Sequence, residues 1–456
     1  MLARSRSLRQ RSSDEIIADL RPRYLPGKPQ LALLLALLAA ASAWCYADFI
    51  LIAHEKSQAA RDDIPRGNLS DLYPRWLGAR ELLLHGRDPY TPQITLEIQT
   101  GYYGRPLDPT RPNDPKDQQA FAYPLYVVFL LAPTVHLPFA QVQVGFRWLL
   151  VLLTLASVPL WLRALRWRVS PTAMVTWMVI TLGSFPAIQG LKLQQLSLLV
   201  CALLAACVVA VVNGALILAG ILLALATIKP QLTAIVAAWL LLWALAGWRS
   251  RKCLALSFAL TMVALLIGSE VLLPGWISRF RAAAADYWQY TGGGKSTLDV
   301  TLGTAFGKPI AILLWFTLAI LGWRMRREPA DGPAFGWALS FVLAVTIVVI
   351  PTFAPYNQLL LLPAFMLAVR FLPELWGKGG MARLFLLLTG VAVLWSWVTA
   401  ALADFALLLF PREFVLRTWA VPLYPSLAIP VAVLGVLAVS ATTMVAKRPR
   451  TTSAST

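Results

Sequence analysis

Two charged residues of this chain suggest chemistry because of where they stand. Asp71 begins a segment with helical spacing, and Lys229 lies at the end of an apolar segment, next to Pro230. A carboxylate fixed on a helix can act as a general base. Alternatively, Asp71 caps that helix, which stabilises it by about 1 kcal/mol. A lysine among membrane-spanning residues costs about 2.5–3.5 kcal/mol to insert, so Lys229 is a functional candidate unless its side chain extends to the membrane surface.

Further polar residues lie near the ends of apolar segments. Lys192 and Gln195 follow one such segment, and for Gln195 both ligand contact and hydrogen bonding between helices are open. Arg279 and Lys295 lie in a hydrophilic stretch that also contains Gly292-Gly-Gly-Lys-Ser296. This run is not a Walker sequence, because the first glycine of that motif would fall at Gln289. It is either a mobile loop or a solvated linker.

Residues that commonly bind metals are too scattered to form a site. The four cysteines lie in apolar segments without CxxC spacing, and the three histidines show no HxxxH or HExxH arrangement: Cys45, Cys201, Cys207, Cys253, His54, His85 and His136. Buried cysteines of this kind behave as small hydrophobic residues. The sequence therefore predicts neither a metal centre nor a cofactor.

The elements that position these residues are membrane helices. Hydrophobic residues make up 58% of the 456 residues and charged residues only 14%, whereas a soluble domain is typically about 25% charged. Apolar runs of about 20 residues, the length of a spanning helix, recur from residue 31 to the C-terminus. The composition predicts an all-α, polytopic transmembrane helical bundle.

The net charge of +18 comes from short basic clusters between apolar runs: Arg4 to Arg11, Arg163 to Arg168, Arg249 to Lys252, Arg324 to Arg327 and Lys447 to Arg450. This distribution is typical of cytoplasmic loops in a membrane protein. It carries no nucleic-acid-binding module. We therefore expect no nucleic-acid partner and place both termini in the cytoplasm.

Thirteen apolar segments are candidates for crossings: 31–52, 122–138, 142–162, 171–188, 193–212, 214–230, 232–247, 253–274, 303–323, 333–351, 358–372, 383–403 and 421–445. Two cytoplasmic termini require an even number of crossings. Segment 122–138 is short and contains Pro124, Pro133 and Pro138, so we predict that it is re-entrant or split. About twelve crossings remain.

This topology divides the chain into a cytoplasmic tail, a membrane domain and a disordered C-terminal tail. The tail covers residues 1–30, the membrane domain covers 31–445, and the disordered tail covers 446–456. Two long hydrophilic stretches, 53–121 and 275–302, fall on the extracytoplasmic side. Loops of such length are usually functional or disordered.

The stretch 53–121 contains ten of the 22 acidic residues of the chain: Glu55, Asp62, Asp63, Asp71, Glu81, Asp88, Glu97, Asp108, Asp114 and Asp117. Apolar residues at 69, 72, 73, 76, 77, 83 and 84 have helical spacing. Pro74 fits only a first turn and Gly86 a C-terminal stop, so the helix begins near Ser70 or Asp71. Its tyrosine and tryptophan favour the membrane interface, and 101–119 is predicted to be irregular.

These residues resemble a known family. The run from Ser70-Asp-Leu-Tyr73 to Gly86-Arg-Asp-Pro-Tyr90 is similar to the first periplasmic loop of glycosyltransferase family 87. That family consists of polyprenol-phosphate-mannose-dependent mannosyltransferases of the GT-C superfamily. The resemblance continues, in the same order, in four short stretches: 121–139, 193–199, 226–231 and 351–363.

The sequence also departs from the family pattern. Gln194 stands where the family has glycine, Tyr-Pro-Leu125 replaces Tyr-Pro-Pro, and Tyr356-Asn357 replace a pair of histidines. The last change affects residues that would contact the donor or the acceptor.

The resemblance implies an inverting hexosyltransferase with a lipid-linked sugar phosphate as donor and a lipid or polysaccharide as acceptor. Asp71 matches the family's loop aspartate and is implied as the general base. Lys229 is implied as the main cation for the donor phosphate, and Gln195 matches a family glutamine. Other candidate substrate-binding residues are Lys192, Arg279, Lys295, Tyr90, Tyr123, Tyr356 and Asn357, with Asp286 and Asp299 as alternative bases. The four aromatic and amide residues among them could equally be interfacial aromatics or polar caps.

The resemblance also implies a multi-pass protein of the cell inner or plasma membrane with an extracytoplasmic active site. A competing hypothesis is a lipid or sugar transporter, in which Lys192 and Lys229 line a pathway and proline-broken helices act as gates. No internal repeat is visible in the sequence, which argues against this alternative.

Overall fold

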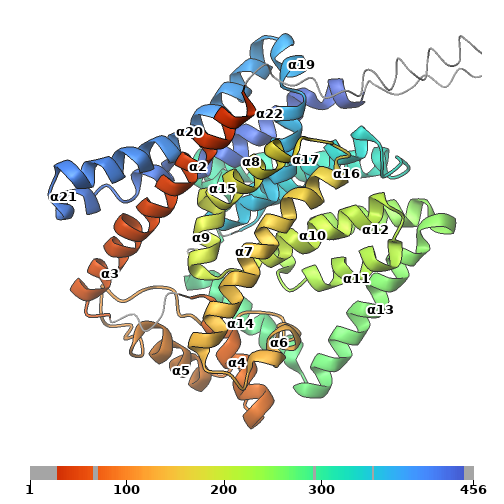
Figure 1. Ribbon diagram of the computed structural model, residues 1–456. Coiled ribbons are helices and arrows are strands. Elements are labelled where there is room, and N and C mark those ends of the chain that lie inside the picture. The colour runs from red at the N-terminus through yellow and green to blue at the C-terminus, as the bar shows by residue number, and fades with distance from the viewer. Residues whose placement is uncertain (1–27, 65–69, 291–293, 352–353, 446–456) are drawn as a thin grey trace, which may run out of the picture.

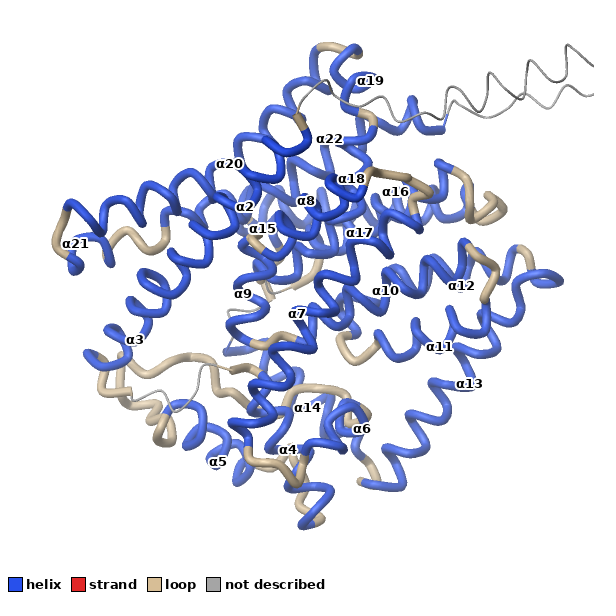
Figure 2. Tube along the Cα trace, viewed as in Figure 1, coloured by secondary structure: helices blue, strands red, loops and turns tan. Residues whose placement is uncertain are grey.

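The computed structural model describes residues 28–64, 70–290, 294–351 and 354–445. The described residues form helices joined by loops, without a strand (Figure 2). In chain order the elements are α2 (Pro29–Tyr46), η1 (Ala47–Leu51), α3 (Ile52–Arg61), α4 (Leu72–His85), α5 (Pro92–Tyr103), α6 (Val127–Leu131), η2 (Ala132–Thr134), α7 (Phe139–Ala164), α8 (Pro171–Leu182), α9 (Phe185–Leu193), α10 (Leu196–Val212), α11 (Leu216–Ala226), α12 (Pro230–Ala246), α13 (Trp248–Leu272), α14 (Trp276–Tyr290), α15 (Thr297–Leu302), α16 (Thr304–Met325), α17 (Pro333–Val349), η3 (Pro355–Leu361), α18 (Leu362–Arg370), α19 (Leu372–Gly377), α20 (Gly380–Leu409), α21 (Arg412–Leu416), η4 (Val421–Leu427) and α22 (Ala428–Val445). The predicted terminal tails lie almost entirely outside the described residues.

The described chain is an all-α polytopic membrane protein. Six helical stretches are long and apolar enough to cross a membrane: Pro29–Arg61, Phe139–Ala164, Trp248–Leu272, Thr304–Met325, Gly380–Leu409 and Arg412–Ala441. A seventh crossing is possible if α8 and α9, which are bent by 56° at their junction, act as one span. Four further apolar helices are shorter: α10, α11, α12 and α17.

The shorter apolar helices differ from the full crossings that the apolar segments suggested. At 1.5 Å per residue, the 11 residues of α11 extend about 16 Å, roughly half of the hydrocarbon core. Segment 358–372 is likewise not one long helix, because it forms the end of the 3₁₀ turn η3 and the nine-residue helix α18. By length alone, six or seven helices qualify where about twelve were expected.

Segment 122–138 does not form a spanning helix, as predicted. It contains the five-residue helix α6 followed by the 3₁₀ turn η2, which includes Pro133. Proline lacks the N–H group needed inside a helix, so three prolines within this segment keep its helical pieces short. The prediction that it is split is confirmed.

The helix predicted near Asp71 is present as α4, but its apolar face packs inside the protein. Leu72 and Trp76 are buried, and the Trp76 ring contacts Phe139 of α7 at 5.1 Å between centroids. A Cβ atom on Gly78 would lie 2.3 Å from the ring of Phe121, so this glycine allows the 121–124 segment to pack closely. The stripe that suggested a membrane interface is therefore a core contact.

The stretch 275–302 was interpreted as a loop and is largely helical. It contains α14 and α15, and residues 291–293 of its glycine-rich run lie outside the described residues. Asp299 closes the N-terminus of α15 in a capping box with Ser296. The elements α4, α5, α6 and α14 gather at one end of the bundle, in the lower part of Figure 1, opposite α19.

The core lies around α10 and α17. Fourteen of the 17 residues of α10 and 14 of the 17 residues of α17 are buried. Around them pack α7, α11, α12 and α22. The two short helices α10 and α17 therefore supply the interior of the bundle.

Candidate active site

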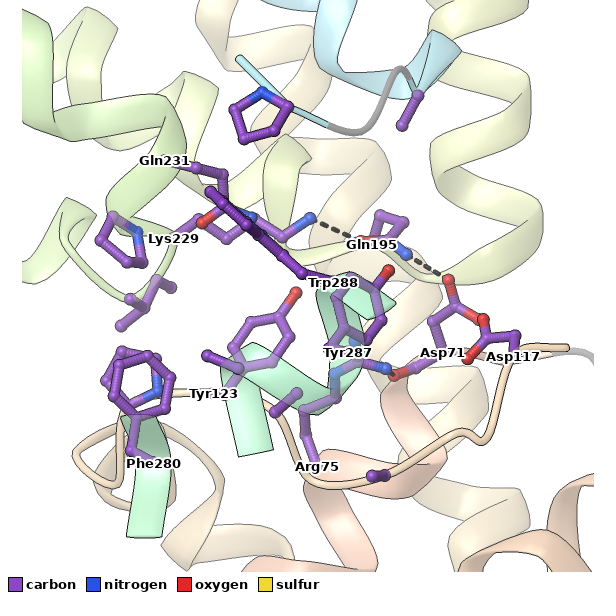
Figure 3. Close-up of a pocket in the computed structure, with 18 of the residues that line it drawn as sticks. Asp71, Arg75, Asp117, Tyr123, Gln195, Lys229, Gln231, Phe280, Tyr287 and Trp288 are labelled. Atoms are coloured by element: carbon purple, nitrogen blue, oxygen red, sulfur yellow. Dashed lines mark hydrogen bonds between the residues drawn. The ribbon is translucent and has the colours of Figure 1, made fainter. Parts of the chain in front are cut away.

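A cavity of about 460 Å³ lies between the gathered helices at this end of the bundle (Figure 3). Asp71 and Arg75 reach it from the start of α4, and Tyr123 from the segment before α6. Gln195 comes from the α9–α10 junction and Lys229 from the α11–α12 junction. The 3₁₀ turn η3 contributes Tyr356 and Asn357, and α14 closes the cavity with aromatic side chains. Six of the residues predicted from the sequence thus come together: Asp71, Tyr123, Gln195, Lys229, Tyr356 and Asn357.

The carboxylate of Asp71 is directed at ligand-accessible space rather than at its own helix. Asp71 occupies the N-cap position of α4, yet its side chain makes no capping hydrogen bond. The Ser70 hydroxyl accepts a bond from the Leu72 N–H at 3.2 Å instead. The Asp71 carboxylate accepts bonds from the Gln195 amide and from the Tyr102 hydroxyl, the latter at 3.2 Å. The capping interpretation is therefore replaced by a carboxylate that faces the cavity.

The position of Asp71 is fixed by the α9–α10 junction. Its backbone N–H donates to the carbonyl oxygen of Leu193 at 2.8 Å. Gln194 is buried in the left-handed conformation with φ of +52°, and its amide bonds Ser70 and the carbonyl of Gln143. Glycine adopts this conformation at least cost, which explains why a glycine would suit this position. In this chain the glutamine instead joins α4 to the bundle.

A chain of buried hydrogen bonds connects Asp71 to Lys229. Gln195 donates to Asp71 and accepts from the Lys229 ammonium at 2.7 Å. Lys229 also donates to the Ser197 hydroxyl at 2.7 Å, and Ser197 donates to Asn357 at 2.7 Å. The Lys229 side chain does not extend to the membrane surface, because the residue is only 3% exposed. A carboxylate and an ammonium are thus held in one cavity, separated by one amide.

Arg75 supplies a second cation, which was not among the residues predicted from the sequence. Its guanidinium lies 4.4 Å from the centre of the Tyr123 ring, and the Lys229 ammonium lies 5.0 Å from the Tyr356 ring. Aromatic faces stabilise cations held against them. Arg75 stands four residues after Asp71, one turn along the same helix face. This four-residue spacing from Asp71 could have identified Arg75 as a site residue from the sequence.

The cavity also contains a second carboxylate and an aromatic wall that sequence reasoning missed. Asp117 and Gln119 lie in a loop rich in proline and charge, where no periodicity marks individual residues. Burial raises the pKa of Asp117, and the neighbouring charge of Asp71 raises it further. Phe280, Tyr287 and Trp288 belong to α14, which had been interpreted as loop.

Four predicted substrate-binding residues lie outside the cavity lining. Lys192 forms an ion pair with Glu55, and Arg279 forms one with Asp88 at 2.6 Å. Lys295 is exposed.

Tyr90 lies behind the cavity, where its hydroxyl donates to the carbonyl oxygen of Tyr123 at 2.7 Å. Asp286 is exposed outside the lining, and Asp299 caps α15. A charged residue close in sequence to the cavity-lining residues therefore need not line the cavity itself, because these side chains face other partners or solvent.

Among the described residues there is no group of three or more histidine, cysteine, aspartate or glutamate side chains that could hold a metal ion. What the cavity offers is chemically simple. The carboxylate of Asp71 can take a proton, the cations Lys229 and Arg75 can bind an anion, and aromatic and amide groups can contact hydroxyl-bearing ligands.

The model of glycosyltransferase family 87 matches residues 121–352, about half of the chain. The matched region includes Tyr123, Gln195, Lys229 and α14, whereas Asp71 and Arg75 precede it. No curated protein and no solved structure gives a significant match to the chain.

Proposed function

The chain belongs to glycosyltransferase family 87, and on that premise we propose that it transfers mannose or another hexose from a polyprenyl phosphate. The acceptor is a lipid or a polysaccharide, and transfer inverts the anomeric centre. The active site is the cavity between α4, α14 and η3, on the extracytoplasmic side of the cell membrane, in an architecture of the GT-C type.

One observation carries this proposal: Asp71 and Lys229 share one cavity and are joined through Gln195. In the reaction, an acceptor hydroxyl oxygen attacks the anomeric carbon while its proton passes to the Asp71 carboxylate. The bond between the anomeric carbon and the phosphate oxygen breaks, and its electron pair stays on the phosphate. Transfer therefore needs a base at the acceptor hydroxyl and positive charge at the departing phosphate.

The two cations suit a phosphate leaving group. Lys229 and Arg75 lie in the same cavity, each against an aromatic ring, and Lys229 is buried. Buried charges act in surroundings of low dielectric constant, where they stabilise a growing negative charge more strongly than in water. The ion pairs of Lys192 and Arg279 lie outside this lining and do not serve the phosphate.

The membrane setting suits a donor with a polyprenyl tail. The cavity lies at an end of a bundle whose long helices are apolar enough to span a bilayer. A lipid-linked donor can keep its tail in the membrane while its phosphate reaches Lys229. A nucleotide sugar has no such tail, so the account predicts that it is not used.

The test is a transfer assay with the purified protein in lipid nanodiscs. A panel of polyprenyl phosphosugars is supplied with an alkyl glycoside as acceptor, and nucleotide sugars serve as control donors. Product formation from a lipid-linked hexose, with inverted configuration, is the expected result. Transport of labelled substrate in proteoliposomes without any sugar transfer would contradict the proposal and favour a transporter.

A further inference from the structure

Asp117 is a carboxylate in the cavity that the transfer reaction does not require. One base, Asp71, suffices to remove the acceptor proton, and a second negative charge would repel the donor phosphate. Asp117 nevertheless lines the same cavity. Its place beside Asp71 therefore needs a different explanation.

The loop that carries Asp117 is held in a defined position. The Tyr103 hydroxyl donates to the Asp117 carbonyl oxygen at 2.7 Å, and the Gln99 amide donates to the carbonyl of Gln118 at 3.1 Å. Gln119 adopts a φ of +52°, and both its N–H and its side-chain amide donate to the Asp117 carboxylate at 3.0 Å. Such backbone strain persists only where the surroundings impose it, and it is common at ligand sites.

The carboxylate lies on the acceptor side of the cavity. In Figure 3 the side chains of Asp71 and Asp117 are adjacent, whereas Lys229 lies beyond Gln195. A donor phosphate on Lys229 leaves the region next to Asp71 for the acceptor. A carboxylate has about four acceptor positions, and the two bonds from Gln119 leave room for a ligand hydroxyl.

We propose that Asp117 binds a second hydroxyl of the acceptor, next to the one that Asp71 deprotonates. Asp117 thereby selects acceptors with neighbouring hydroxyls, such as a sugar or another ring polyol, over simple alcohols. The inference rests on the proposed function. Tyr287 and Trp288 line the same cavity and supply the aromatic wall against which such a ring can lie.

The experiment uses octyl mannoside as the acceptor probe, together with the set of its monodeoxy analogues. A site built to bond a hydroxyl discriminates against the analogue that lacks it. One of the analogues keeps the attacked hydroxyl but lacks the neighbouring hydroxyl that Asp117 binds. For this analogue the wild-type protein is expected to show a kcat/KM about tenfold lower than for octyl mannoside. Equal use of all transferable analogues by the wild type would overturn the proposal, and this comparison needs no variant.

The variant Asp117→Asn assigns the discrimination to this residue. The expected result is a raised KM for octyl mannoside, a KM for the donor that does not rise, and loss of the penalty for that one analogue. Asp108→Asn, at a half-exposed acid of the same loop outside the cavity lining, is the matched control and should keep the penalty. If Asp117→Asn keeps it as well, the assignment is wrong. Absence of transfer by the wild type from every donor would instead refute the proposed function, and this inference with it.

Discussion

The two long hydrophilic stretches of the chain, 53–121 and 275–302, meet at the same cavity but contribute different chemistry. The first supplies Asp71, Arg75 and Asp117, which carry charge. The second supplies ring and methyl groups from α14, whereas its cation Arg279 faces Asp88 and its Lys295 is exposed. From the sequence, both stretches contained candidate substrate-binding residues, whereas only the first contained the predicted base.

The difference lies in how each charged side chain is held. Asp71 is bonded to Gln195, Tyr102 and, through its backbone, Leu193, so that its carboxylate is presented at a fixed place. Arg279 makes an ion pair at the surface, of a kind that typically contributes about 0–1 kcal/mol. Charged groups fixed by buried partners are those that can be preorganised for reaction.

The largest effect is expected for Asp71→Asn. The amide keeps the shape of the side chain but cannot take a proton, so the transfer rate should fall by about 10²–10⁴-fold. Initial rates with a polyprenyl phosphosugar measure this. Asp63→Asn changes an exposed acid of the same stretch and should stay within about twofold of the wild type. Near-normal transfer by Asp71→Asn would show that Asp71 is not the general base.

Lys229→Met should have the next largest effect. Methionine fills a similar buried volume without the charge, so the rate should fall by about 10²–10³-fold through loss of phosphate stabilisation. The matched control is Lys192→Met, a second buried lysine, which pairs with Glu55 outside the cavity. The folded fraction of Lys192→Met should retain transfer activity. Equal losses of transfer rate in the two variants would indicate a purely structural role for Lys229.

Gln195→Ala should lower the rate by about tenfold, because it removes the amide that orients Asp71 and leaves both neighbours short of a partner. Gln189→Ala, at a buried glutamine of α9 outside the cavity, provides the comparison. Measuring kcat and KM for transfer by the two variants separates a role in orienting Asp71 from a role in packing. If both lose the same activity, Gln195 acts only in helix packing.

Acidification should weaken acceptor binding several-fold through Asp117. Burial and the nearby Asp71 raise the pKa of Asp117, while Arg75 opposes the shift. As the pH falls, Asp117 therefore takes up a proton at a higher pH than an ordinary aspartate. The protonated carboxyl group accepts fewer hydrogen bonds from the hydroxyl of the acceptor substrate. The KM for octyl mannoside should rise toward acidic pH in the wild type but stay level in Asp117→Asn. Parallel profiles would show that another group causes the change.

Arg279→Ala and Lys295→Ala should have the smallest effects, each within about twofold of the wild-type kcat/KM, because exposed charges contribute little. Transfer assays at two salt concentrations check this. A large, salt-dependent loss in either variant would place the second stretch at the phosphate after all.

Several features of the fold could be predicted because local chemistry decides them. Pro74 and Gly86 mark the two ends of α4, which runs from Leu72 to His85, with Gly86 at φ of +67°. The prolines of 122–138 similarly kept its helical pieces short. The lengths of the crossings were less predictable, because an apolar run looks the same whether it spans a bilayer or fills the core as α10 does.

The site was predictable where a residue type is unusual for its surroundings. Lys229 stood out because a lysine is rare in an apolar segment. Asp117 did not, since it was one acid among many in an irregular loop, and its place depends on contacts from Tyr103 and Gln99 that sequence spacing does not reveal. Arg279, predicted as a substrate-binding residue, does not line the cavity, and sequence spacing likewise does not reveal its ion pair with Asp88.

The central claim is that one cavity divides the work between a base, Asp71, and a phosphate-binding cation, Lys229. Equilibrium binding of polyprenyl phosphate to the wild type, Asp71→Asn and Lys229→Met in nanodiscs tests this claim most directly. We expect affinity no lower than that of the wild type for Asp71→Asn and affinity about tenfold or more lower for Lys229→Met. Unchanged binding by Lys229→Met, or loss of binding by Asp71→Asn, would contradict it.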